Sequence, residues 1–259
     1  MRRILLDISY ALRTRNFWIA VILSAAAFLE TALAEGSGDL LLLYQMSMSY
    51  GIFLIVAPCI AVLPNVRELS SYKGSIMKYN LLRCGTGRYI IEQAISSSIV
   101  GGLALMAGPA LSLALLSFKF PIVSESFFYV YMAAPEYNAS FSNLVRAQHY
   151  YLYLCAKLLM VFMFGATMNM IAFAVSTCTK ESFVIAFTPF ILIQSTTNLT
   201  NRAGTVFVRP AIYLHGNLVN LPFDNTCGFL GFVILVHLII ALICLAVSNC
   251  ILRRRLKYA

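Results

Sequence analysis

The chain has 259 residues, of which 60% are hydrophobic and only 11% are charged. An average soluble domain has roughly 25% charged residues, so this chain has too few charges to cover a surface that faces water. A soluble fold of this length also cannot hide several apolar segments of about 20 residues, each long enough to cross about 30 Å of hydrocarbon. The composition therefore predicts an all-α polytopic membrane protein.

The net charge of +9 does not indicate a nucleic-acid-binding protein. The basic residues lie in short segments beside the apolar ones, and no stretch outside them combines a basic groove with stacking aromatic side chains. We therefore expect membrane lipid, and no nucleic acid, around the chain. The seven cysteines form no C-x-x-C pair and the three histidines are far apart, so no metal site is expected.

Residues 1–16 precede the first apolar run and have an amphipathic pattern. Ile4, Leu5, Ile8 and Leu12 fall on one helical face, whereas the charged side chains lie largely elsewhere. This spacing predicts an N-terminal amphipathic interfacial helix along the inner leaflet. The alternative is an ordinary basic flank that only sets the topology.

Six apolar runs then predict six transmembrane helices, which form one transmembrane domain over residues 1–259. A window of about 19 residues places the spans at 17–34, 40–64, 89–118, 150–176, 183–199 and 229–252. The longest inner loop is 65–88, and two longer outer segments, 119–149 and 200–228, are rich in aromatic residues. We expect these outer segments to lie on or dip into the outer leaflet.

The distribution of Lys and Arg among the connecting segments predicts the orientation. Fourteen of them lie on the side of the two termini and four on the other side. Because short cytoplasmic segments carry an excess of basic residues, we expect both termini in the cytoplasm.

No catalytic constellation is visible in the sequence. There is no G-x-x-x-x-G-K-[ST] loop to hold nucleotide phosphates, and neither G-x-S-x-G nor H-E-x-x-H occurs. An intramembrane enzyme would need clustered acids, bases or metal ligands within the spans, and only dispersed ones are present. We therefore expect no enzyme activity and no directly bound cofactor, so that the energy for any active transport comes from another chain.

Polar residues within the spans are the candidates for function, because their burial in hydrocarbon costs several kcal/mol unless they are paired or face water. We predict a pathway or gating role for Lys157, Asn169 and Gln194; a structural pair or snorkelling is the alternative for Lys157. Small residues in the third span, at Ala94, Ser98 and Gly102, predict a close helix contact, either within the chain or with a second copy.

The inner loop combines cationic and apolar side chains, which suits a docking site for a partner; a solvated basic tether is the alternative. Its Arg67-Glu68, Lys73-Gly74-Ser75, Leu81-Leu82 and Arg88-Tyr89-Ile90 follow the second span in that order. The chain also has a basic leader (residues 1–16), six spans and a basic tail after the last span. Together with these, the order of the loop residues resembles the ABC-2 type permeases, the membrane-spanning subunits of bacterial ATP-binding-cassette exporters. The resemblance covers almost the whole chain.

This resemblance implies a permease subunit that dimerises with a second permease subunit, as a homo- or heterodimer, above two copies of a cytoplasmic ABC ATPase subunit. ATP and Mg²⁺ would bind to those ATPase chains. In this family the leader is an elbow helix and the inner loop carries the helix that couples to the ATPase. The corresponding residues here are Arg67, Glu68, Tyr72, Lys73, Gly74, Ser75 and Met77.

The leading hypothesis is therefore a multi-pass permease of a bacterial cell membrane that exports a lipophilic drug, peptide or lipid-like substrate. The alternative is a membrane anchor or immunity protein that binds an antimicrobial peptide at the outer aromatic segments without transporting it. Two departures from the family pattern stand beside the resemblance. Glu92 and Gln93 replace the basic residue that often follows the Arg-Tyr entry, and the outer segment 119–149 is longer than expected.

Overall fold

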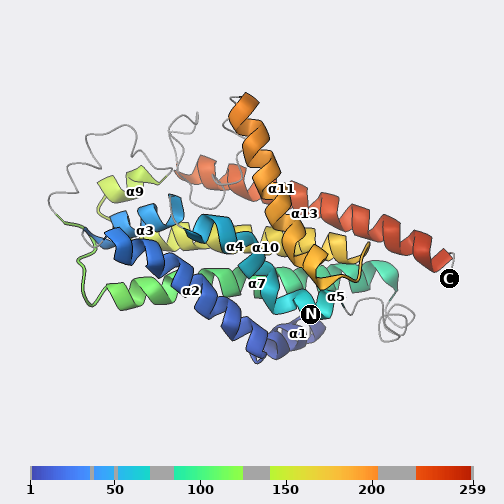
Figure 1. Ribbon diagram of the computed structural model, residues 1–259. Coiled ribbons are helices and arrows are strands. Elements are labelled where there is room, and N and C mark those ends of the chain that lie inside the picture. The colour runs from blue at the N-terminus through green and yellow to red at the C-terminus, as the bar shows by residue number, and fades with distance from the viewer. Residues whose placement is uncertain are drawn as a thin grey trace.

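The computed structural model describes residues 2–35, 38–49, 52–70, 85–124, 141–203 and 226–257. Every regular element within these ranges is helical (Figure 1). In chain order they are α1 (Arg2–Leu12), α2 (Arg15–Glu35), α3 (Leu40–Ser49), α4 (Ile52–Val62), the 3₁₀ turn η1 (Leu63–Asn65), α5 (Val66–Ser70), α7 (Thr86–Leu116), α9 (Ser142–Arg146), α10 (Tyr150–Ser176), α11 (Ser182–Ala203) and α13 (Thr226–Lys257).

Six helical segments are long and apolar enough to cross a membrane. They are Arg15–Ala34, Ile52–Ser70, Gly87–Leu116, Tyr150–Ser176, Ser182–Leu199 and Cys227–Arg254. The structure thus confirms the prediction of an all-helical chain with six such helices. Helices are the expected solution, because a helix satisfies its own backbone hydrogen bonds where no water is present.

Helices α7 and α10 form the centre of the bundle, and α11 and α13 lie at its edge (Figure 1). In α7 and α10, 56% of the apolar stretch is buried, against 11% in α11 and 17% in α13. Helices α2 and α4 pack beside the central pair. The bundle therefore has a dense core and two weakly covered helices.

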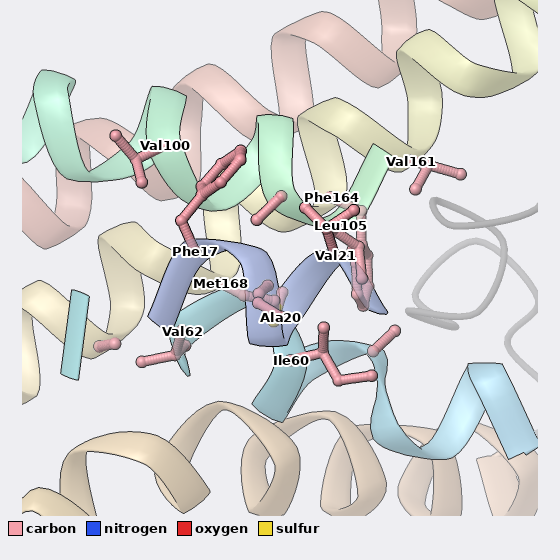
Figure 2. Close-up of a cluster of buried hydrophobic side chains, with 14 of the residues drawn as sticks. Phe17, Ala20, Val21, Ile60, Val62, Val100, Leu105, Val161, Phe164 and Met168 are labelled. Atoms are coloured by element: carbon pink, nitrogen blue, oxygen red, sulfur yellow. The ribbon is translucent and has the colours of Figure 1, made fainter. Parts of the chain in front are cut away.

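Apolar side chains from α2, α4, α7 and α10 meet in this core. Figure 2 shows side chains from these four helices gathered around α2, among them Phe17, Ala20, Val21, Ile60, Val62, Val100, Leu105, Val161, Phe164 and Met168. Most of these side chains are fully buried. Segments from both halves of the sequence thus contribute to one continuous core.

Glycines let the central backbones approach closely. A Cβ built on Gly102 of α7 would lie 2.7 Å from the Phe162 carbonyl oxygen of α10, and one built on Gly165 would lie 3.0 Å from the Gly101 carbonyl oxygen. Ala94 and Ser98, which were predicted to share this packing face, are also buried. In this chain Gly102 therefore faces a helix of the same copy, α10.

The second span differs in detail from the predicted range 40–64. The corresponding segment is Ile52–Ser70, which contains α4, η1 and α5, whereas α3 precedes it, before residues 50–51. Pro64 lies in η1, where its missing N–H group interrupts the α-helical hydrogen bonds and the turn tightens to a 3₁₀ helix. The first residues of the predicted inner loop are thus helical.

The close approach of α7 and α10 makes the Gly101→Ala variant a direct test of the packing. Its new Cβ would overlap the Asn169 amide and lie 2.7 Å from the Ala61 carbonyl oxygen. We expect a loss of about 1–3 kcal/mol of stability, typical of overpacked cores, measured by unfolding of the purified protein in detergent. Gly87→Ala on the same helix meets nothing within 4 Å, so it should keep or slightly raise stability. Equal stability of the two variants would refute the packing.

Candidate functional site

The three predicted pathway residues lie in three separate places. Asn169 belongs to a buried amide cluster between α4, α7 and α10, Lys157 lies in an aromatic cluster nearer the start of α10, and Gln194 lies on an exposed face of α11. Along α10, Asn169 and Lys157 are about 18 Å apart at 1.5 Å per residue. The structure therefore does not bring the three predicted pathway residues together, and their pathway role stays a prediction.

The amide cluster joins three helices. Asn65 Nδ2 donates to the Ser97 carbonyl oxygen of α7 at 2.8 Å and to Asn169 Oδ1 of α10 at 2.9 Å. Asn169 Nδ2 in turn donates to the Ala61 carbonyl oxygen of α4 at 2.6 Å and to that of Gly165 at 3.2 Å. Both side chains are fully buried, and hydrogen bonds offset the cost of that burial.

Lys157 lies among aromatic rings. Its Nζ is 5.4 Å from the ring centroid of Tyr153 and 5.6 Å from that of Phe141. Phe141, which caps α9, also contacts Phe229 of α13 edge to face at 5.6 Å between centroids. The ammonium group is fully buried, so its attraction to the ring faces is stronger than in water. This cluster ties α9 to α10 and α13.

Helix α11 presents polar side chains on its outside. Gln194, Ser195 and Asn198 are all exposed, following an exposed apolar stretch that contains Phe183 and Phe187, whose rings stack at 4.3 Å. Gln194 lies about 18 Å along the helix from Ser182, which is membrane depth for a span of this length. The far end of α11 also stands away from the bundle (Figure 1).

The first two predicted coupling residues lie in α5, which packs against α10 and α11. Arg67 is exposed and Glu68 partly buried. Tyr72, Lys73, Gly74, Ser75 and Met77 lie outside the described residues. On the neighbouring start of α7, Arg88 Nε donates to Glu92 Oε1 at 2.9 Å, so Glu92 is satisfied within its own helix.

Sequence analysis singled out neither Asn65 nor Asp39, two buried polar residues whose side chains bond to other segments of the chain. Asp39 precedes α3; its Oδ1 accepts from the Leu42 N–H at 2.8 Å and its Oδ2 from the Ser124 N–H at 3.0 Å. An Asp before an apolar run predicts a helix cap. The contact with Ser124 could not be predicted, because the two residues are far apart in sequence. Within the described ranges, no three His, Cys, Asp or Glu side chains lie close enough together to hold a metal.

The double role of Asp39 predicts a graded response to substitution. We expect Asp39→Ala to lower stability by about 1–2 kcal/mol, because it removes a helix cap and the bond to Ser124. Asp39→Asn retains one oxygen acceptor and should lose less. Hydrogen exchange of the backbone amides in α3 measures the local effect. Ser117→Ala, which removes only an exposed local bond at the end of α7, is the control; equal exchange in it and in Asp39→Ala would contradict the capping role.

The comparisons with known proteins give no assignment. No protein-family model matches the chain, and no curated protein or solved structure is significantly similar to it. What is established is the coarse class: an all-helical chain with six helices long and apolar enough to span a membrane.

Proposed function

We propose that the chain is the membrane-spanning subunit of an ATP-driven exporter. Two such subunits, or this chain and a related one, would form the permease, and two ABC ATPase chains on the cytoplasmic side would supply the energy. The cargo class is a lipophilic drug, peptide or lipid-like molecule. The observation that carries the proposal is the exposure of Gln194 and Asn198 on α11, within the candidate span Ser182–Leu199.

The two edge helices differ in what they expose. Between Ile234 and Val247 the exposed side chains of α13 are all apolar, Leu235, Leu238 and Leu242 among them, which suits contact with lipid. Helix α11 instead exposes the amides of Gln194 and Asn198. An amide in hydrocarbon without a partner costs several kcal/mol, so this face of α11 is not built for lipid.

A second permease subunit and a hydrated path between the two account for that face. An amide both donates and accepts hydrogen bonds, so Gln194 and Asn198 can pair with the same residues of a copy related by a twofold axis. Polar residues commonly join helices in this way within membranes. A path for cargo along the same contact would use the hydroxyl and amide groups that do not pair.

The opposite ends of the bundle differ in charge. The segments that meet at the α5 end contain Arg13, Arg15, Arg67, Arg88 and Lys180, and the C-terminal end of α13 lies toward the same end (Figure 1). By the positive-inside rule this end belongs in the cytoplasm, where an ATPase chain would reach α5. The alternating directions of the spans then place α9 and the start of α3 outside.

Helix α1 supports the same orientation. Its Ile8, Ala11 and Leu12 pack toward the bundle, whereas Leu5, Leu6 and Tyr10 are exposed. Such a helix would bury its outer apolar side chains in the headgroup region of the inner leaflet. Leu5 shares the helical face of Ile8 and Leu12 by its spacing, but it is exposed, whereas those two side chains pack against the bundle.

Cysteine labelling tests the surroundings of α11. In a background without native cysteines, Gln194→Cys and Asn198→Cys should react with a membrane-impermeant maleimide, or form a disulfide between copies, about tenfold faster than Leu235→Cys, because only a hydrated thiol forms the reactive thiolate. Leu235 is an exposed position within the candidate span of α13. Similar, slow reaction at all three positions would mean that α11 faces lipid.

Co-purification tests the partner. An ATPase chain should co-purify with the wild-type protein, and Arg67→Glu should reduce its yield severalfold, because it reverses an exposed charge in α5. Lys119→Glu reverses an exposed charge beyond the other end of α7 and serves as the control. Recovery of no ATPase with the wild type, or equal loss in both variants, would contradict the proposal. Peptide protection that persists without any ATPase activity would favour the membrane-anchor alternative.

A further inference from the structure

The amide cluster lies at the joint between α4 and α5. The apolar segment Ile52–Ser70 changes from α-helix to the 3₁₀ turn η1 and back to α-helix, and Asn65 is the last residue of that turn. A 3₁₀ stretch within a longer helix often marks a hinge. Here Pro64 cannot donate the bond that would stiffen the turn, so the helix needs support from its neighbours to transmit a force.

The two amides supply that support on both sides of the turn. Asn65, at the end of η1, donates to α7 and to Asn169 of α10. Asn169 then donates back to Ala61, which precedes η1 in α4. The hydrogen bonds form a closed path, Asn65 to Asn169 to Ala61, that spans the turn and holds its two ends against α10.

The surrounding backbone leaves the pair little freedom. Gly101 of α7 lies against the Asn169 side chain and the Ala61 carbonyl, where no Cβ fits. Gly165, one turn before Asn169, lies against the backbone of Gly101 and Gly102. Asn65 and Asn169 are 2% and 0% exposed, so water does not compete for their bonds.

We propose that Asn65 and Asn169 are positioning residues that transmit movement of α5 to α7 and α10. Without them, displacement of α5 would be absorbed by bending at η1. With them, the turn, α7 and α10 move as one body, and α11, which also packs against α5, moves relative to that body. This inference rests on the proposed function, since it assigns the route by which an ATPase bound near α5 would act on the spans.

The variants are chosen to separate transmission from stability. Asn65→Leu keeps a similar volume but removes both donated bonds. The double variant Asn65→Leu/Asn169→Leu replaces both partners by apolar groups, which is often nearly neutral for stability. Ser24→Ala is the matched control, because it removes a buried bond of 2.8 Å to the Leu105 carbonyl between α2 and α7, away from η1.

The readout is the change in labelling of Gln194→Cys by fluorescein maleimide when MgATP and vanadate are added to the complex with the co-purifying ATPase. We expect this nucleotide-dependent change to fall about fivefold or more in Asn65→Leu, within the range of typical coupling energies. The double variant should regain heat stability but not the nucleotide-dependent change, and Ser24→Ala should keep the change. Recovery of the change together with stability in the double variant would overturn the proposal.

A second measurement on the chain alone separates this inference from the proposed function. In Asn65→Leu the backbone amides of α5 should exchange hydrogen about tenfold faster than in wild type, because α5 is no longer held across the turn; in Ser24→Ala they should not. Suppose that the α5 amides exchange faster in Asn65→Leu but that the wild-type protein shows no response to nucleotide. This result would support the bridging role of Asn65 and Asn169 and refute the exporter. Unchanged exchange of the α5 amides in Asn65→Leu would refute the bridging role itself.

Discussion

Hydrocarbon offers a polar side chain no water for hydrogen bonds, so each polar side chain within a span needs another partner. Asn65 and Asn169 meet this need inside the bundle by bonding to each other and to three helices. Gln194 and Asn198 lie on the exposed side of α11, where the proposed second subunit would provide their partners. The buried pair thus helps to hold the core, and under the proposed function the exposed pair would mark the contact with a second subunit.

The packing also differs between the centre of the bundle and its edge. Glycines at 101, 102 and 165 bring α7 and α10 together closely enough for the amides to reach across, and apolar side chains of α2 and α4 close the core around them. Helices α11 and α13 share little of that core. Under the proposed function, a well-buried centre and a little-buried α11 would let a force applied at α5 move α11 relative to α7 and α10. Near the start of α10, the contacts of Lys157, Phe141 and Phe229 join α10 to two further elements, α9 and α13, so the two ends of α10 have different neighbours.

Apolar run lengths were sufficient to predict six spanning helices, because each helix meets the hydrocarbon on its own and needs no long-range information. The neighbours of a residue were not predictable in this way. The spacing of Ala94, Ser98 and Gly102 indicated a close contact, but only the fold shows that Gly102 meets Phe162 of the same chain. Likewise Asn65 reads as an ordinary loop residue after a proline until Ser97 and Asn169 are seen beside it. The surroundings of Lys157 also come from residues distant in sequence.

The central claim is that the exposed face of α11 belongs to an assembly with a second permease subunit and a separate ATPase. Native mass spectrometry of the complex, purified gently from its own membrane, measures this most directly. The account predicts two permease subunits, including at least one copy of this 28.7 kDa chain, with two ATPase chains. A stable, functional particle that holds one copy of this chain, no second permease subunit and no ATPase would contradict it.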